Sequence, residues 1–224
     1  MQTITPRVSI IMAVYNRDFS LVKRALDSVM AQDFKDFELI IVDDGSNVEL
    51  GRDILSYVAQ HEDQLRYLRH KNMGQALSAN RGILNSIGQY IGFIDGDDEY
   101  KPNHISACLA SIGDYDLIAS TMENIAANEE DLFMPSNNDP HSDVFVDNFV
   151  AFGTLFGKRG VFESLPFRKA YSFDADFYQR ASERYITAKL DLRTYKYYMG
   201  LPDSMTVKKK KLRQELLSAQ QQNS

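Results

Sequence analysis

The chain has 224 residues, 44% of them hydrophobic, which is enough to build a sizeable packed core as one domain or two small ones. It carries 31 acidic and 25 basic side chains, for a formal charge of -6, and this mild acidic excess disfavours a nucleic-acid-binding protein, which needs basic surface to displace counterions. Cys108 is the only cysteine, so an intramolecular disulfide is excluded and a reducing compartment is favoured.

The N-terminal stretch, Met1 to Arg7, is mostly polar and lacks the basic start, apolar stretch and cleavage site of a signal peptide. The longest apolar runs, such as Val8 to Val14, are far shorter than the roughly 20 residues that cross a bilayer. We therefore expect a cytoplasmic protein.

From Val8 to Thr121, short apolar runs alternate with helical patterns, which is typical of βαβ units and predicts an α/β fold with a mostly parallel sheet flanked by helices. The first run is apolar almost throughout, as expected for a strand buried on both faces. Asp18 or Ser20 is placed to cap the first helix, and Gly88 to end the third. The expected strands are 8–14, 38–42, 66–69, 90–94 and 116–121, and the expected helices are 21–30, 54–58, 76–87 and a segment that begins at Pro102.

The second half has a less regular pattern. Residues 123–142 contain asparagines, acids and two prolines, which predict a long loop. After it we expect a helix near 143–152, a strand at 153–157, and helices near 159–165 and 174–183. The tail, 208–224, combines four lysines with leucines and predicts a partly helical segment that is either solvated or drawn weakly to an anionic membrane surface.

Two of the expected strands end in acidic turns, Asp43 to Ser46 and Asp95 to Glu99. Ligands of open parallel sheets bind outside the carboxyl ends of the strands, so both turns are expected at one binding edge. Carboxylates so close together repel one another unless a cation is present, and Mg²⁺ or Mn²⁺ binds through one or two carboxylates plus substrate phosphates. The sequence therefore predicts a divalent metal at Asp95, Asp97 and Asp98. The alternative is a solvated loop, because aspartate and glycine are common turn formers.

Other chemistry has weaker support in the sequence. Its four histidines lack metal-ligand spacing, and Cys108 lies among apolar residues of an expected helix, where a buried packing role is favoured over a nucleophile. Neither the Gly-x-Gly-x-x-Gly fingerprint nor the phosphate loop ending in Gly-Lys-Ser/Thr occurs. Dehydrogenase and P-loop functions are therefore disfavoured.

Four segments, in this order and spacing, resemble the inverting family-2 glycosyltransferases, which have the A-type nucleotide-binding fold. They are Val8 to Arg17, ending Ala-Val-Tyr-Asn-Arg; Ile40 to Ser46; Asn72 to Gly74 followed by Ala79 to Ile83; and Gly88 to Asp98 followed by Tyr100 and Pro102. The resemblance covers the first half of the chain firmly and the second half thinly. It implies that Ala13, Tyr15 and Asn16 line the nucleotide pocket, that Asp43 or Asp44 reads the base edge, that Asn80 braces the pocket, that Asp97 lies near the ribose, that Asp97 and Asp98 hold Mn²⁺ or Mg²⁺, and that Asp95 supports the cluster.

In the second half, Phe173 to Arg180 resembles the family's Glu-Asp-x-Asp segment, which implies that Asp174 is the catalytic base. Phe173 replaces the usual acid, so Asp176 stays open as the base, as does a purely structural role for both aspartates at a helix start. The residues that fall where the family closes over the diphosphate are Arg180, Tyr197, Tyr198, Ser204 and Thr206, whereas Met199 and Leu201 replace the basic or histidine residues expected nearby.

The resemblance further implies a donor- and metal-binding half at 1–122, an acceptor-side half at 123–207 and a separate tail at 208–224. The implied reaction moves a sugar with inversion from a nucleoside diphosphate sugar, with a UDP-sugar favoured, to a glycan or lipid-linked acceptor, as in cell-surface polysaccharide synthesis. Two alternatives stay open. One is a sugar nucleotidyltransferase, although Tyr15 to Asp18 stands where such enzymes carry a glycine- and basic-rich loop. The other is an inactive protein that binds a nucleotide sugar.

Overall fold

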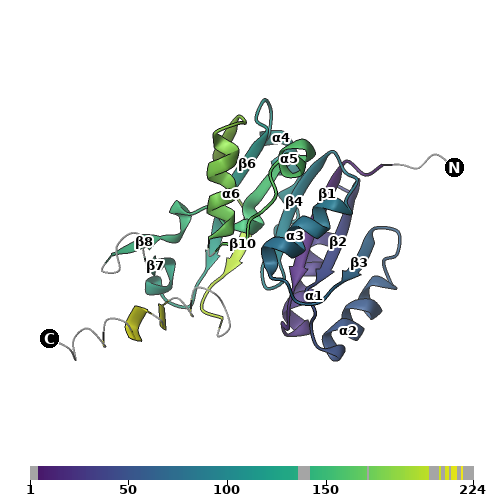
Figure 1. The fold of residues 1–224 in the computed structure, drawn as a ribbon, viewed down its shortest axis with the longest axis horizontal. Helices are drawn as coiled ribbons and strands as arrows, with labels where there is room; N and C mark the ends of the chain where they lie inside the picture. Colours follow the sequence, from purple (N-terminus) through teal and green to yellow (C-terminus); the bar gives the residue numbers. More distant parts are fainter. Residues whose placement is uncertain are drawn as a thin grey trace.

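The computed structural model describes residues 5–135, 142–170 and 172–201, together with 207, 210, 211, 213–215 and 218. Within these residues, eight strands form one sheet in the order β3-β2-β1-β4-β9-β6-β10-β5, and helices cover both of its faces (Figure 1). His141, Ser204, Thr206 and most of the tail at 208–224 lie outside the described residues. None of the described helices has the length and apolar composition needed to cross a bilayer.

The sheet is mostly parallel, which confirms the fold class expected from the sequence. Strands β1 to β4 run parallel to one another, β10 is parallel to β6, β9 is antiparallel to β4 and β6, and β5 is antiparallel to β10. The strands are β1 Val8–Val14, β2 Phe37–Asp43, β3 Leu65–Arg69, β4 Tyr90–Asp95, β5 Glu99–Tyr100, β6 Leu117–Ile125, β9 Leu155–Lys158 and β10 Thr187–Tyr198.

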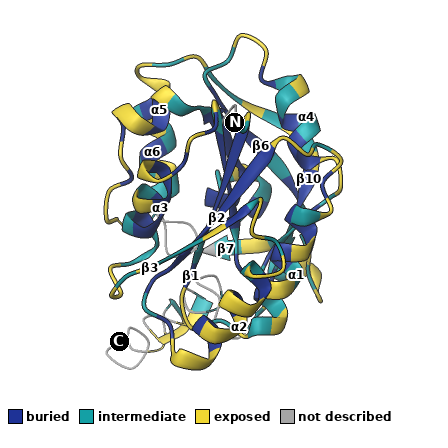
Figure 2. Ribbon diagram, turned by 90° about the vertical axis from the view of Figure 1, so that its right-hand side faces the viewer, coloured by how far each residue is buried: buried dark blue, intermediate teal, exposed yellow. Residues whose placement is uncertain are grey.

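Each face of the sheet packs against its own set of helices, so the central strands are buried on both sides (Figure 2). In β1, Ile10 and Met12 point into the layer of the first helix set, and Ile11 points into the other. This is why β1 is a nearly continuous apolar run. The first set is α1 Phe19–Met30, α2 Val48–Val58 and α4 His104–Ser111, and the second is α3 Gln75–Leu84, α5 Arg159–Ser164 and α6 Phe173–Ser182.

The ends of the helices refine the expectations from sequence. Asp18 caps α1, since its Oδ1 accepts a hydrogen bond from the Ser20 amide at 2.7 Å. The expected extension of α3 to Ile87 is wrong, because the helix ends at Leu84. Just beyond it, the Ser86 hydroxyl donates a hydrogen bond to the Ile83 carbonyl. In a longer helix this carbonyl would accept from a backbone amide, so the serine side chain takes the place of that bond. Helix α4 begins two residues after Pro102.

The stretch 123–152 differs most from expectation. Strand β6 continues to Ile125, a 3-10 turn covers Glu129–Leu132, and β7, Phe133–Pro135, pairs with β8, Asp143–Phe145, so the described part of the expected loop is largely structured. The expected helix near 143–152 is wrong, because only 3-10 turns at Val146–Asn148 and Phe152–Thr154 follow β8. The expected strand near 153–157 and the two helices after it are confirmed as β9, α5 and α6.

Strand β10 was not expected from the sequence, although it has twelve residues. Its pairing with β6 is interrupted between Leu190 and Tyr195, where Arg193 adopts a left-handed φ of 48°. A bulge of this kind reverses the inward and outward order of side chains, so the alternation that identifies a strand is lost. The bulge directs Tyr195 into the interior, where it is fully buried.

The side chain of Tyr195 packs directly against the backbone of Gly153, where there is no room for a Cβ atom. A Cβ atom added at Gly153 would lie 2.1 Å from the Tyr195 hydroxyl oxygen and 2.3 Å from Cζ, so Gly153→Ala is expected to destabilise the protein by about 1–3 kcal/mol. Gly160, in α5, offers a matched control, since its added Cβ meets no atom within 4 Å. Gly160→Ala is expected to be neutral or to stabilise by about 0.5–1 kcal/mol. Urea denaturation measures both, and equal stability of the two variants would contradict the packing described.

Candidate active site

A cavity of about 650 Å³ opens at the carboxyl ends of β1, β2 and β4, within the size range of small-molecule sites. Its walls come from four stretches that are separate in sequence: the turn after β1, each of the two acidic turns, and the segment that leads into α3. The lining residues are Ala13, Val14, Tyr15, Asn16, Arg17, Asp44, Asn72, Gly74, Gln75, Asp95, Gly96 and Asp97. The two acidic turns therefore do meet at one edge of the sheet.

The turn after β1 is fixed by Asn16. Its φ is 46°, in the left-handed region that asparagine tolerates better than most residues. The Asn16 amide donates to Ser46 Oγ at 3.1 Å, and its side-chain oxygen accepts from the Asn47 amide at 2.8 Å. These bonds join the turns that follow β1 and β2 and leave Tyr15, which is 49% exposed, at the cavity.

The aspartates of the first acidic turn occupy different environments. The Asp44 carboxylate reaches the cavity and accepts hydrogen bonds from the backbone amides of Met73 at 2.7 Å and Gly74 at 2.8 Å. Asp43 is fully buried away from it and forms an ion pair with Arg69 at 3.1 Å. Of the two candidates for reading the base edge, Asp44 is therefore the one that faces the cavity.

The second acidic turn contributes Asp95 and Asp97 to the cavity. The side-chain amide of Gln75 donates to Asp95 Oδ1 at 2.5 Å, and Arg17 forms an ion pair with Asp97 at 2.8 Å. Burial raises the pKa of Asp95 to about 7, and the negative charges of Asp97 and Asp174 add to this effect. Burial therefore raises the pKa of Asp95 more than the repulsion between the carboxylates does, although the sequence suggested only the repulsion.

Asp98 lies behind the cavity and is 1% exposed. Its carboxylate accepts a hydrogen bond from the Tyr195 hydroxyl at 2.7 Å and from the Tyr198 backbone amide at 2.9 Å. Burial, together with the negative charges of Asp95 and Asp97, raises its pKa well above the ordinary value. Tyr195 and Tyr198 both belong to β10, so a strand of the second half of the chain holds the acidic turn of the first half.

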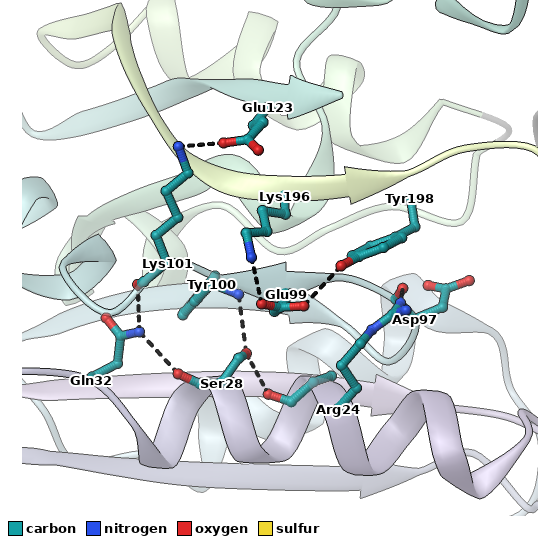
Figure 3. A network of polar contacts seen from close by, with 11 residues as sticks. Arg24, Ser28, Gln32, Asp97, Glu99, Tyr100, Lys101, Glu123, Lys196 and Tyr198 are labelled. Carbon is teal, nitrogen blue, oxygen red and sulfur yellow. Dashed lines mark hydrogen bonds and ion pairs between the residues drawn. The ribbon is translucent and has the colours of Figure 1, made fainter. Parts of the chain in front are cut away.

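Helix α1 holds the same turn from the opposite side (Figure 3). The Arg24 guanidinium donates to the Asp97 carbonyl and lies over the ring of Tyr198, 3.6 Å from its centroid. Glu99 accepts from Lys196 at 2.7 Å and from the Tyr198 hydroxyl at 2.9 Å. The acidic turn is therefore held between α1 and β10, with little freedom to move alone.

Asp174 stands in the first turn of α6, outside the lining of the cavity. Its carboxylate accepts from the Phe152 amide at 3.2 Å and the Ala175 amide at 2.9 Å. Burial raises the pKa of Asp174, and its negative charge in turn contributes to the raised pKa of Asp95. Asp176 instead forms an ion pair with Arg180 at 2.8 Å. A carboxyl with a raised pKa is a typical candidate for a general base, which favours Asp174 over Asp176.

The departure at Phe173 has a packing explanation. Its ring lies against Phe152, with centroids 5.3 Å apart, and against Phe167, at 5.6 Å. Asn80 does not line the cavity; its side chain pairs with both backbone groups of Phe167, at 2.8 and 2.9 Å. Asn80 therefore joins α3 to the loop before α6, and Phe173 anchors the helix start that carries Asp174.

Several residues of the site were not assigned roles from the sequence. Arg17, Asn72 and Gly74 lie inside motifs that could have pointed to them, whereas Gln75 and Tyr195 carry no such signal.

No three His, Cys, Asp or Glu side chains in the described part of the chain are arranged to hold a metal ion. Cys108 is confirmed as a buried packing residue, and burial raises the pKa of its thiol to about 12.

Comparison with known proteins gives concordant results. The model of the family "Glycosyl transferase family 2" matches residues 9–190. An uncharacterized glycosyltransferase of Rickettsia felis is 34% identical over 142 residues, which are 63% of this chain and 23% of that protein. The crystal structure of Staphylococcus aureus TarS (residues 1–349) with UDP-GlcNAc has a TM-score of 0.69 at 18% identity, covering 90% of this chain and 60% of that one.

A second solved structure with the same fold is the mannosyltransferase PcManGT of Pyrobaculum calidifontis in complex with GDP-Man and Mn²⁺. It has a TM-score of 0.70 at 16% identity and covers 91% of this chain and 59% of that one. The chain thus spans less than two thirds of the length of these relatives. At these identities, the two structures establish the fold.

Proposed function

Because the chain belongs to glycosyltransferase family 2, we propose that it transfers a sugar from a nucleoside diphosphate sugar to an acceptor hydroxyl. The observation that carries the proposal is the cavity itself. It brings Asp44, Asp95 and Asp97 together at the carboxyl ends of the strands, and the negative charge of Asp174, outside the cavity lining, contributes to the raised pKa of Asp95. The proposal therefore combines a nucleotide-binding edge and a candidate base in one site.

The nucleotide is proposed to lie against Ala13, Tyr15 and Asn16, with Asp44 at the edge of the base. Tyr15 offers an open aromatic face, and Asp44 is an acceptor whose position two backbone amides fix. A base with a ring N–H, such as uracil or guanine, suits such an acceptor, and we propose a uracil nucleotide as the first choice. Asn80 supports this half of the site by holding α3 in place.

The side chains of the second acidic turn suit a hard divalent cation, Mn²⁺ or Mg²⁺, which takes oxygen ligands and shares them with substrate phosphates. A cation would also relieve the unfavourable charge of Asp95, whose pKa is raised to about 7. We propose Asp97 and Asp98 as its ligands, with Asp95 as support. Each Asp98 oxygen accepts one hydrogen bond and keeps a second lone pair. When bound, the metal would supply Lewis-acid stabilisation of the departing phosphate oxygens.

Asp174 is proposed to accept the proton of the acceptor hydroxyl as that oxygen bonds to the anomeric carbon. The bond from this carbon to the diphosphate breaks in the same displacement, which inverts the anomeric configuration. The amides of Phe152 and Ala175 orient the carboxylate, and burial raises its pKa toward the range useful for a base.

The acceptor is proposed to be a growing glycan or a lipid-linked sugar of cell-surface polysaccharide synthesis, bound on the side formed by residues 123–207. In the same division, residues 1–122 bind donor and metal. The tail at 208–224 is assigned no part in the chemistry. Two of its basic residues already pair with the chain, Lys210 with Asp131 at 3.2 Å and Arg213 with Asp143.

The test is incubation of the purified chain with UDP-glucose, UDP-GlcNAc and GDP-mannose, with Mn²⁺ or with EDTA, followed by chromatography of the nucleotide products. The expected result is slow hydrolysis of the donor, in which water takes the place of the acceptor hydroxyl and a nucleoside diphosphate is released, and EDTA should suppress it. Formation of pyrophosphate from a nucleoside triphosphate and a sugar phosphate would favour the nucleotidyltransferase alternative. Binding of a sugar nucleotide without turnover would favour the inactive binding protein. Absence of both binding and turnover with every donor would refute the proposal.

A further inference from the structure

The cavity contains an ion pair to which the proposed function assigns no role. Arg17 and Asp97 both line the cavity, and Nη2 of the arginine lies 2.8 Å from Oδ2 of the aspartate. Their side chains are only 26% and 13% exposed. Water therefore screens the pair less than it screens a surface salt bridge.

Each aspartate of the acidic turn has a different partner. Asp95 accepts from the neutral amide of Gln75, and Asp98 accepts from a tyrosine hydroxyl and a backbone amide. Among these three aspartates, and within the described residues, Asp97 is the one whose carboxylate forms an ion pair, with Arg17; Glu99 pairs with Lys196 outside the cavity lining. Arg24 also contacts Asp97, but through the backbone carbonyl rather than the carboxylate. Arg17 thus supplies a positive charge directly at a carboxylate proposed to hold the metal.

We propose that Arg17 is a built-in counter-ion that pairs with Asp97 in the metal-free protein and moves to the donor's diphosphate once a divalent cation takes its place. This inference rests on the proposed function. A planar guanidinium can bind a carboxylate or a phosphate through two parallel hydrogen bonds, so one side chain suits both partners. Arg17 would thereby keep the acidic turn ordered before the donor arrives and would help to neutralise the diphosphate afterwards.

Because Arg17 pairs with Asp97 in one state and with the diphosphate in the other, removing it should change the affinities for Mn²⁺ and for the nucleotide in opposite directions. Without Arg17, the Asp97 carboxylate has no competing cation, so Mn²⁺ alone should bind more tightly. A nucleoside diphosphate without metal should bind more weakly, because it loses a charged hydrogen-bond donor. A residue that only supports the fold would weaken both kinds of binding together.

The experiment measures two affinities for the wild type and for Arg17→Gln by isothermal titration calorimetry. They are the affinity for Mn²⁺ without nucleotide and that for UDP in EDTA. For Arg17→Gln we expect Mn²⁺ to bind about threefold to tenfold more tightly, and UDP about tenfold more weakly. Arg17→Lys keeps the charge and should lie between the two. Lys23→Gln removes a positive charge from an exposed i,i+4 pair with Asp27 on α1 and should change both affinities less than about twofold.

An unchanged or weaker affinity for Mn²⁺ in Arg17→Gln would overturn the inference, as would an equal gain in Lys23→Gln, which would reveal a general effect of charge. If the wild type binds UDP and Mn²⁺ but Arg17→Gln alters neither affinity, the inference about Arg17 fails while the proposed function stands. If neither protein binds Mn²⁺ or UDP, both fail.

Discussion

Replacing Asp174 by asparagine is expected to lower kcat for sugar transfer by about 10²- to 10⁴-fold while leaving the affinity for the donor nearly unchanged. The asparagine keeps the shape of the side chain, and its one carbonyl oxygen can still accept from the Phe152 amide, but it loses the bond from the Ala175 amide and cannot take a proton from the acceptor hydroxyl. Steady-state kinetics give kcat, and calorimetry with the sugar nucleotide gives the affinity. A loss of donor affinity equal to the loss of kcat would contradict a role as base.

The pH dependence of the wild type provides a second check on Asp174. Burial raises its pKa above the ordinary value of 3.8, so the carboxylate becomes protonated, and inactive as a base, at a higher pH than a free aspartate. We expect kcat/KM to fall as the pH drops through this raised pKa, and Asp174→Asn to lack this acidic limb. A raised pKa also means that the ionised form of Asp174 costs stability above that pKa.

Asp176→Asn is the matched control, since it lies two positions away on the same helix. Asp176 forms an i,i+4 ion pair with Arg180, an interaction typically worth about 0.3–0.5 kcal/mol on a helix. Its replacement is expected to change kcat by less than about fivefold. A larger loss for Asp176→Asn than for Asp174→Asn would move the role of base to Asp176.

The first half of the fold could be predicted because its signals are local. Strand β1 is buried on both faces and therefore apolar throughout, and Asp18 caps α1 through a contact two residues away. Strand β10 could not be predicted, because its bulge at 191–194 breaks the alternation and its partner β6 is about seventy positions earlier. The strand that the sequence did not predict is therefore one that depends on pairing distant segments.

The same distinction applies to the site. The acidic turns were found from sequence because strand and turn are adjacent in the chain. The orientation of each carboxylate was not, because long-range contacts decide it. Asp43 and Asp44 are neighbours, yet Arg69 holds one in the interior while the amides of residues 73 and 74 hold the other at the cavity. Tyr195 reaches Asp98 from ninety-seven positions away, and no local pattern indicates that contact.

Replacing Asp98 by alanine is expected to abolish the part of donor binding that depends on Mn²⁺. The change removes a proposed metal ligand and leaves the buried Tyr195 hydroxyl and Tyr198 amide without their acceptor, at a cost of about 1–3 kcal/mol for each group. Tyr195→Phe separates these effects, because it removes the hydroxyl but keeps the carboxylate. It should weaken Mn²⁺-dependent binding about tenfold, as loss of a residue that orients a metal ligand typically does. Calorimetry with the sugar nucleotide, with Mn²⁺ and with EDTA, measures both variants. If both variants lose the same amount of donor affinity, and lose as much with EDTA as with Mn²⁺, then Asp98 acts only by holding the turn against β10.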